Sequence, residues 1–319
     1  MKKLMGMIIL LVVLMAFICI YQFSTTGEAA FLKPINLANL LQRVGMLGIY
    51  SLGAGVVIIS GGIDLSIGSF IALVATTTAL FAAQGISPWI IVACMLPVCA
   101  LLGWWHSFIV GRFSLQPFMA TLASLLFFRG FARGIADGKG ITLDATPAFN
   151  FIGNGNIFGI PMPFIILLVL GGIVAFIMNY TVMGRYLFAV GRNTEAVRYS
   201  GIKVNTVRTV AYVTCALLAG IAGAVELSYT GEVQPANTGL MYEMWAVAAA
   251  VLGGCSLRGG EGTVFGVIIG AALIRVMENG MNLVGIPSDW QWSVIGAVVI
   301  CGVIADAAHK QRQAKQIKS

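Results

Sequence analysis

Charge is scarce in this chain of 319 residues. Only 10% of its residues are charged, whereas 59% are hydrophobic, and the mean hydropathy is +0.93. Soluble globular domains carry about 25% charged residues, so this composition excludes one. Apolar runs long enough to cross a bilayer, roughly 20 residues each, recur from end to end. We therefore expect an all-α, polytopic integral membrane protein with a single transmembrane domain over residues 1–319.

Motifs for metal, redox and nucleotide chemistry are also missing. The six cysteines occur without CxxC or Cys/His spacing, which favours buried small hydrophobic side chains. Neither of the two histidines has a triad or ligand set around it in the sequence. No GxxxxGK[ST] phosphate loop occurs, and no ladder of intramembrane Asp, Glu or His indicates a proton-driven carrier. We expect no catalytic residue, no metal and no cofactor, and a source of energy outside this chain.

The basic residues predict the orientation in the membrane. With both termini cytoplasmic, most of the 19 Lys and Arg fall on the cytoplasmic side, as the positive-inside rule requires. The net charge of +7 is then a topology signal, and no nucleic-acid partner is expected. Ten apolar runs predict ten transmembrane helices, over residues 4–23, 42–60, 65–83, 89–110, 117–135, 161–180, 208–228, 242–257, 262–283 and 290–306.

A polar, basic segment with helix-forming residues interrupts the apolar chain at 184–208. It uses about two dozen residues where a connecting loop needs only a few. Ala196, Val197 and Tyr199 could pack a short helix that ends at Gly201. We interpret 184–208 as a docking surface for a cytoplasmic partner. The alternative is an ordinary cytoplasmic loop whose arginines only fix the topology.

Two glycine-rich segments predict breaks in helices. The first, SGGIDLSIGS at 60–69, lies between two apolar runs, and Asp64 with Ser66 could cap the helix that follows. If this break is deep in the membrane, it borders a pathway; if it lies at the cytoplasmic interface, it is a tight turn. The second, at 251–266, repeats the Gly-Gly-x-x-Leu pattern, and the run before it is short for a span.

Few ionisable residues lie inside the predicted spans. Arg275 and Glu278 are three residues apart, so they can neutralise each other on one helical face. They favour an alternative function, a secondary transporter or channel that acts alone. The missing charge relay and the docking segment favour a pore subunit that is powered by a separate ATPase.

Five segments resemble the permease subunits of bacterial ribose-type sugar ABC importers: ISGGIDLSIGSFIAL (59–73), LQPFMATLASLLFFRG (115–130), GRYLFAVGRNTEAVRYSGIKVN (184–205), VLGGCSLRGGEGTVFGVIIGA (251–271) and NGMNLVGIPSDWQWSVIGAVVI (279–300). The resemblance implies a type II-like importer permease in the inner membrane that works by alternating access. It also implies a second permease copy or paralogue, ATP-binding cassette subunits, and a periplasmic or tethered sugar-binding protein. Related permeases carry pentoses, hexoses or autoinducer 2, and branched-chain amino acid permeases share the architecture.

The resemblance also implies roles for individual positions. One departure is Cys255, where such permeases often carry a small polar residue. We expect coupling to the ATPase from Gly191, Arg192, Asn193, Glu195, Ala196, Gly201 and Ile202. We expect the translocation pathway and its hinges to include Gly61, Gly62, Asp64, Ser66, Gly68, Gly253, Gly254, Ser256, Gly259 and Gly260.

Overall fold

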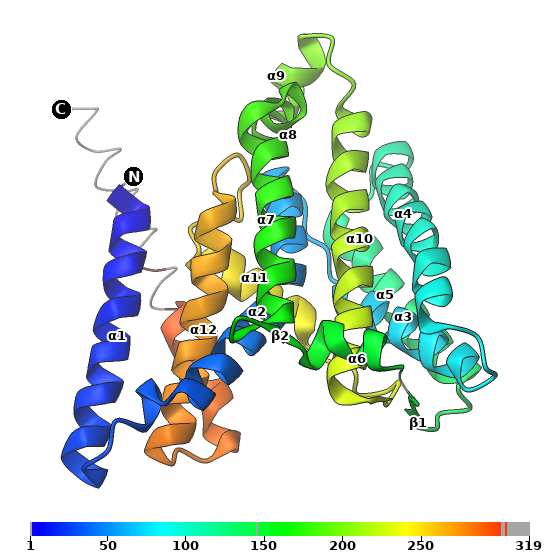
Figure 1. Ribbon diagram of the computed structural model, residues 1–319. Coiled ribbons are helices and arrows are strands. Elements are labelled where there is room, and N and C mark those ends of the chain that lie inside the picture. The colour runs from blue at the N-terminus through cyan, green and yellow to red at the C-terminus, as the bar shows by residue number, and fades with distance from the viewer. Residues whose placement is uncertain (1, 145, 301–303, 305–319) are drawn as a thin grey trace, which may run out of the picture.

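The computed structural model describes residues 2–144, 146–300 and 304, and helices make up most of this part of the chain (Figure 1). Seven of these helices are long and apolar enough to cross a membrane. They are α1 (Lys2–Thr26), α2 (Pro34–Ile59), α4 (Pro88–Arg112), α5 (Pro117–Ile135), α7 (Met162–Tyr180), α10 (Val204–Thr230) and α12 (Val264–Val284). Two shorter apolar helices, α3 (Ile67–Ala82) and α11 (Tyr242–Leu252), and a helical stretch over 288–300 accompany them.

Each predicted span coincides with one of these helices, so the polytopic all-α prediction is confirmed. The predicted span 117–135 matches α5 at both ends, because Pro117 starts that helix. The predicted start of α2, residue 42, was wrong, because the helix begins at Pro34. Its first turns contain polar residues, so hydropathy alone does not mark them as part of a span. The last predicted span, 290–306, is helical as far as 300, and 301–303 and 305–306 lie outside the described residues.

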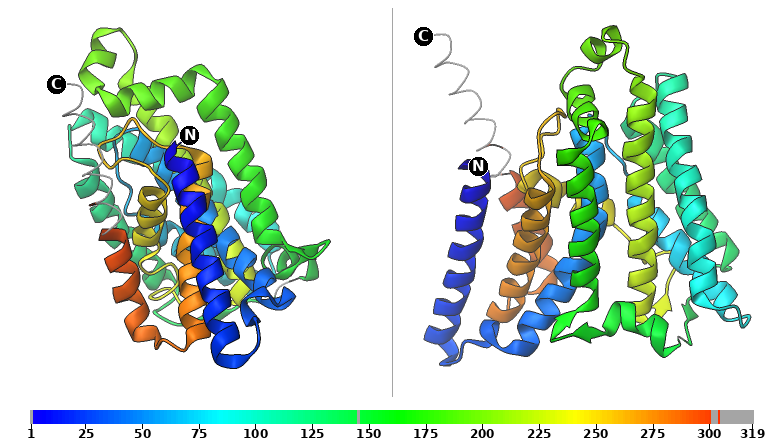
Figure 2. Two further views of the ribbon diagram at one scale, coloured as in Figure 1. Left: turned by 90° about the vertical axis from the view of Figure 1, so that its left-hand side faces the viewer. Right: turned by 45° about the horizontal axis from the view of Figure 1, so that its top comes forward.

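The centre of the bundle is formed by α2 and α10. Of the most apolar window of α2, 89% is buried, against 6% for α1, so α2 is a core helix and α1 a peripheral one. Small residues allow the close packing: a Cβ on Gly53 of α2 would lie 2.9 Å from the Cα of Cys215 in α10. Figure 2 shows α1 at the edge of the bundle, where it packs against α12.

The bundle has two different ends, which we call the α9 end and the hairpin end. The α9 end, uppermost in Figure 1, carries α8 (Val182–Arg192), α9 (Thr194–Tyr199) and the start of α1. The hairpin end carries the 3-10 helix η1 (Ala30–Leu32), α6 (Pro147–Asn154) and four strands, β1 (Ile141–Thr142), β2 (Asn156–Ile157), β3 (Ile160–Pro161) and β4 (Glu232–Val233). The antiparallel pair β1–β4 joins two loops that are distant in the sequence, and β2 pairs with β3.

Both predicted helix breaks are confirmed. The chain leaves helical geometry after Ile59 and resumes it at Ile67, and it does so again between Leu252 and Val264. With 11 residues, α11 is about 16 Å long at 1.5 Å per residue, half of what a bilayer requires. Since α3 and α11 both begin inside the bundle, non-helical segments must reach the interior from each end.

Candidate functional site

Three of the predicted functional segments meet at the α9 end, in a cluster that we call the glycine junction: Gly61, Gly191, Gly259 and Gly260. The Gly260 amide donates a hydrogen bond to the carbonyl of Ile59 at 2.8 Å, which joins the second break to the end of α2. A Cβ on Gly259 would lie 2.7 Å from the carbonyl oxygen of Gly191 and 2.8 Å from the Cα of Gly61. The end of α8 therefore contacts both breaks backbone to backbone.

Only glycine fits the junction. Gly61 and Gly259 have φ values of +83° and +82°, in the left-handed region that side chains disfavour. The restriction on Gly191 is steric, because a Cβ there would overlap the carbonyl of Ile59 and lie 2.5 Å from the amide nitrogen of Gly260. With no side chain between the three segments, a displacement of α8 must move both breaks.

Beyond the junction, α9 projects from the bundle as a short capped helix. The side chain of Asn193 accepts a hydrogen bond from the Ala196 amide at 3.0 Å, and Gly201 (φ +78°) follows the helix in a left-handed conformation, as predicted. Val197 is buried and anchors α9 against the core. Glu195 and Arg198 form an exposed ion pair at 3.2 Å, which contributes little stability.

The predicted coupling residues therefore fall into two groups. Gly191 and Arg192 lie at the junction, where a Cβ on Gly260 would be 2.8 Å from the Cβ of Arg192. Ile202 packs partly buried against the core. The residues exposed on and around α9 form the second group: Asn193, Glu195, Ala196 and Gly201.

The first break runs from the glycine junction into the interior. Asp64 and Ser66 are both buried, and Asp64 Oδ1 accepts hydrogen bonds from the Ser66 amide at 2.9 Å and from its hydroxyl at 2.5 Å. The prediction that these two side chains cap α3 was wrong: Ser66 makes no side-chain cap, and Asp64 binds Ser66 itself. Instead, the carboxylate of Glu243, from the start of α11, lies against the start of α3: a Cβ on Gly68 would be 2.5 Å from its Oε2 atom.

At the start of α3 the first break meets the segment that leads into α11. A Cβ on Gly68 would overlap the carbonyl of Gly239, which has a φ of +68°. Arg129 of α5 holds this second segment, because its guanidinium donates to the carbonyls of Pro235 at 3.2 Å and Gly239 at 3.0 Å, and also to that of Thr238. Sequence reasoning missed Arg129, Gly239 and Glu243 as site residues; the only available signal was a charge within or beside an apolar run.

A buried polar cluster lies beside the first break. His106 of α4, for which the sequence offered no partner, has its Nδ1 atom 4.0 Å from Oδ2 of Asp64, too far for a hydrogen bond. The Tyr212 hydroxyl of α10 is also buried and has no hydrogen-bond partner in the described part of the chain, and a Cβ on Gly62 would lie 2.8 Å from it. These groups keep hydrogen-bonding capacity unused inside the core.

The second break is a compact loop at the α9 end. Gly254 has a φ of +90°, and a Cβ on Gly253 would overlap the backbone of Gly266 in α12. Ser256 donates its amide to the carbonyl of Glu261 at 3.0 Å, and Gly259 donates its amide to Ser256 at 2.8 Å. The loop therefore presents Gly259 and Gly260 to the junction, whereas Gly253 and Gly254 end α11.

Comparisons with known proteins agree on one class. The family described as "Branched-chain amino acid transport system / permease component" matches residues 36–303. The chain is 36% identical to the ribose import permease protein RbsC of Bacillus subtilis, with 87% of this chain and 86% of that protein aligned. It is 35% identical to RbsC of Escherichia coli K12 (92% of each) and 31% identical to the xylose transport system permease protein XylH of that strain (94% and 92%). No solved structure matches the chain.

Proposed function

This chain belongs to the family of permease components described for branched-chain amino acid transport systems, and we propose that it is the permease subunit of an ABC importer that carries a monosaccharide, ribose or a related sugar. The main support for this proposal is the similarity to ribose import permeases over about nine tenths of the chain. Ribose and xylose permeases among the relatives favour a sugar over an amino acid or autoinducer 2. The protein is a multi-pass transport subunit of the inner membrane, and ATP hydrolysis belongs to a separate ATP-binding cassette subunit.

The α9 end is the cytoplasmic side in this proposal, and the N-terminus lies on the same side. The elements and loops of this end carry the basic residues that the positive-inside rule requires: Arg112 ends α4, Arg185 and Arg192 lie in α8, Arg198 lies in α9, Lys203 and Arg208 lie before and in the first turns of α10, and Arg258 lies in the second break. The exposed α9 then seats in the ATP-binding subunit. A single chain offers one such helix, so a pair of ATP-binding subunits requires two permease chains, identical or paralogous.

Transport follows from the contacts of the glycine junction. When the ATP-binding subunits close, they move α9 together with α8. Val197 and the glycine junction connect these two helices to the rest of the bundle, so the motion reaches it. Gly191 passes this motion to Gly61 and Gly259, and so to both breaks. The breaks are the hinges of alternating access, where glycine absorbs backbone rotation without a clash.

The hairpin end receives the sugar-binding protein. The loops over about 136–160 and 229–241 are tied together by the β1–β4 pair. From these loops the segment held by Arg129 leads inward to α11, so a docked binding protein can influence the position of α11.

Reconstitution tests the function directly. The chain is placed in proteoliposomes with its ATP-binding subunit and its binding protein, and uptake of D-ribose, D-xylose and L-leucine is measured. We expect ATP-dependent uptake of a pentose and none without the ATP-binding subunit. Leucine uptake without sugar uptake would assign the amino-acid alternative. Uphill accumulation by the chain alone would instead make it a secondary transporter.

A further inference from the structure

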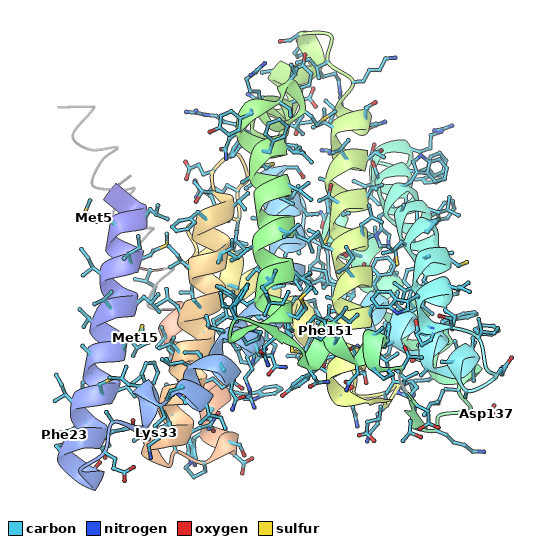
Figure 3. All side chains as sticks on the ribbon, in the orientation of Figure 1. Met5, Met15, Phe23, Lys33, Asp137 and Phe151 are labelled. Carbon is cyan, nitrogen blue, oxygen red and sulfur yellow. The ribbon has the colours of Figure 1, made fainter. Side chains whose placement is uncertain are left out.

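One feature of the sequence has no role in the coupling mechanism: the intramembrane pair Arg275 and Glu278. In the structure it belongs to a polar stripe on α2 and α12, which pack against each other; Lys33, labelled in Figure 3, marks the residue before α2. The stripe lines a cavity of about 110 Å³, and all seven lining residues are polar. They are Asn36, Asn39 and Arg43 on α2 and Arg275, Glu278, Asn279 and Asn282 on α12. The spacing of three, four and seven residues places each set on one helical face.

Part of the stripe is held together by its own contacts. The side-chain amides of Asn36 and Asn279 exchange two hydrogen bonds, at 3.1 Å and 2.8 Å. Arg275 donates to Glu278 at 2.5 Å, and Arg43 lies 3.9 Å from the other oxygen of that carboxylate. The stripe is therefore a preformed wall of amides and paired charges across the α2–α12 contact.

Other groups of the stripe keep unused hydrogen-bonding capacity. Asn39 lines the cavity and is itself exposed, so its amide is accessible to a ligand. Tyr50 lies two turns beyond Arg43 on α2, with its buried hydroxyl toward the guanidinium of Arg275. Within the described residues, neither this hydroxyl nor Nε of Arg275 makes a hydrogen bond of normal geometry. The large majority of buried polar groups in folded proteins are hydrogen-bonded. Free donors and acceptors around a polar cavity indicate a polar ligand.

The stripe extends from the hairpin end toward the short helix α11. Its residues on α2 occupy the first turns of that helix, and Arg275 lies about midway along α12, so the stripe spans the outer half of the bundle in the proposed orientation. Beyond the stripe on α2 lies Tyr50, whose ring stacks on that of Tyr242 at a centroid distance of 5.1 Å. Tyr242 is the first residue of α11 and donates its hydroxyl to Glu226 at 2.9 Å.

We propose that the polar stripe is a sugar-binding subsite in the outer half of the pathway, which takes a neutral monosaccharide by its hydroxyl groups. Amides, a guanidinium and a carboxylate together offer the donors and acceptors that neighbouring hydroxyls require. A cavity of 110 Å³ has room for about three or four waters at ~30 Å³ each, so it accepts the hydroxyl edge of a sugar ring. Such partial contact suits a passage that must release its cargo. This subsite rests on the proposed function.

The test uses the complete importer in proteoliposomes and measures D-ribose uptake per ATP hydrolysed. Wild-type uptake is established first: if the wild type carries no monosaccharide, the proposed function fails, and the subsite fails with it. In Asn39→Leu/Asn282→Leu the ratio should fall by about tenfold, the effect of one or two lost hydrogen bonds. Asn39→Gln/Asn282→Gln, which keeps the amides, should retain more of it. Gln84→Leu, an exposed amide at the hairpin end away from the stripe, serves as the matched control.

If the wild type carries the sugar, the variants decide on the subsite alone. A wild-type ratio of uptake to ATP hydrolysis in the double leucine variant would overturn the subsite. Equal losses in the leucine and glutamine variants would also overturn it, because they would show that side-chain shape matters and hydrogen bonding does not. If the double variant does not assemble, Asn39→Ser replaces it, since position 39 is exposed and tolerates the change. A severalfold fall in that ratio supports the subsite, and an unchanged ratio excludes it.

Discussion

Replacing Gly191 by alanine is the sharpest test of the glycine junction, because it adds one methyl group at the point where three segments meet. In the present structure that methyl would overlap the Ile59 carbonyl and lie 2.5 Å from the Gly260 amide nitrogen. Neither neighbour is the flexible end of a side chain, so the backbone must move. The helical backbone of α8 itself accepts alanine, since Gly191 has no positive φ.

The expected cost can be worked out from two contributions. Overpacking a tight contact costs about 1–3 kcal/mol. Separating Gly260 from Ile59 removes their hydrogen bond of 2.8 Å, which is worth about 1 kcal/mol. If the junction is closed in only one state of the transport cycle, a penalty of roughly 2–4 kcal/mol shifts the equilibrium between the states by about thirtyfold or more.

Uptake and ATP hydrolysis are therefore measured together in the reconstituted importer. We expect Gly191→Ala to lower sugar uptake per ATP hydrolysed by at least about tenfold, while α9, which is capped independently by Asn193, still binds the ATP-binding subunit. Gly172→Ala on α7 is the matched control, because a Cβ there would meet nothing within 4 Å. Normal coupling in Gly191→Ala would refute the role of the junction.

Three further experiments test other parts of the structure. Ala196→Trp on the exposed α9 should abolish uptake while the protein still inserts in the membrane; normal uptake would remove the docking role of α9. In single-cysteine variants, Arg198→Cys should react with a membrane-impermeant thiol reagent only from the cytoplasm. Phe158→Cys, at the fully exposed β2–β3 turn, should react only from outside. The reverse pattern of labelling would invert the proposed topology. Arg129→Met should loosen the segment 234–241 by removing three hydrogen bonds from a charged donor, about 1.5–3 kcal/mol each, and so raise its proteolysis from the outer side; unchanged proteolysis would show that this segment holds without Arg129.

Features that depend on local sequence were predictable. Hydropathy placed the ten apolar helical segments, and the proline at the start of α5 fixed a helix boundary to the residue. The short helix α9 was predicted from Ala196, Val197, Tyr199 and Gly201, which lie within six positions of the chain. The two glycine-rich breaks were visible because Gly-Gly pairs and polar residues interrupt apolar runs.

Features that depend on tertiary packing were not predictable. The sequence marked Gly61, Gly191 and Gly259 as separate candidates, but nothing local indicates that they touch. Glu243 lies against the start of a helix more than 170 positions away, and His106 approaches Asp64 only because α4 packs on α10 beside the first break. Without an alignment, an isolated Glu or His in an apolar run gives no partner.

The contacts of the two breaks explain how a motion at one end of the bundle can act at the other. The glycine junction joins α8 to the first break, and the first break ends where Gly68 meets Gly239. Gly239 is in turn bound by Arg129, in the segment that continues to the β1–β4 pair at the hairpin end. At both crossings backbone touches backbone, so no flexible side chain absorbs a displacement. An arrangement of this kind has few intermediate positions, and a bistable packing suits a transporter that must close one end before it opens the other.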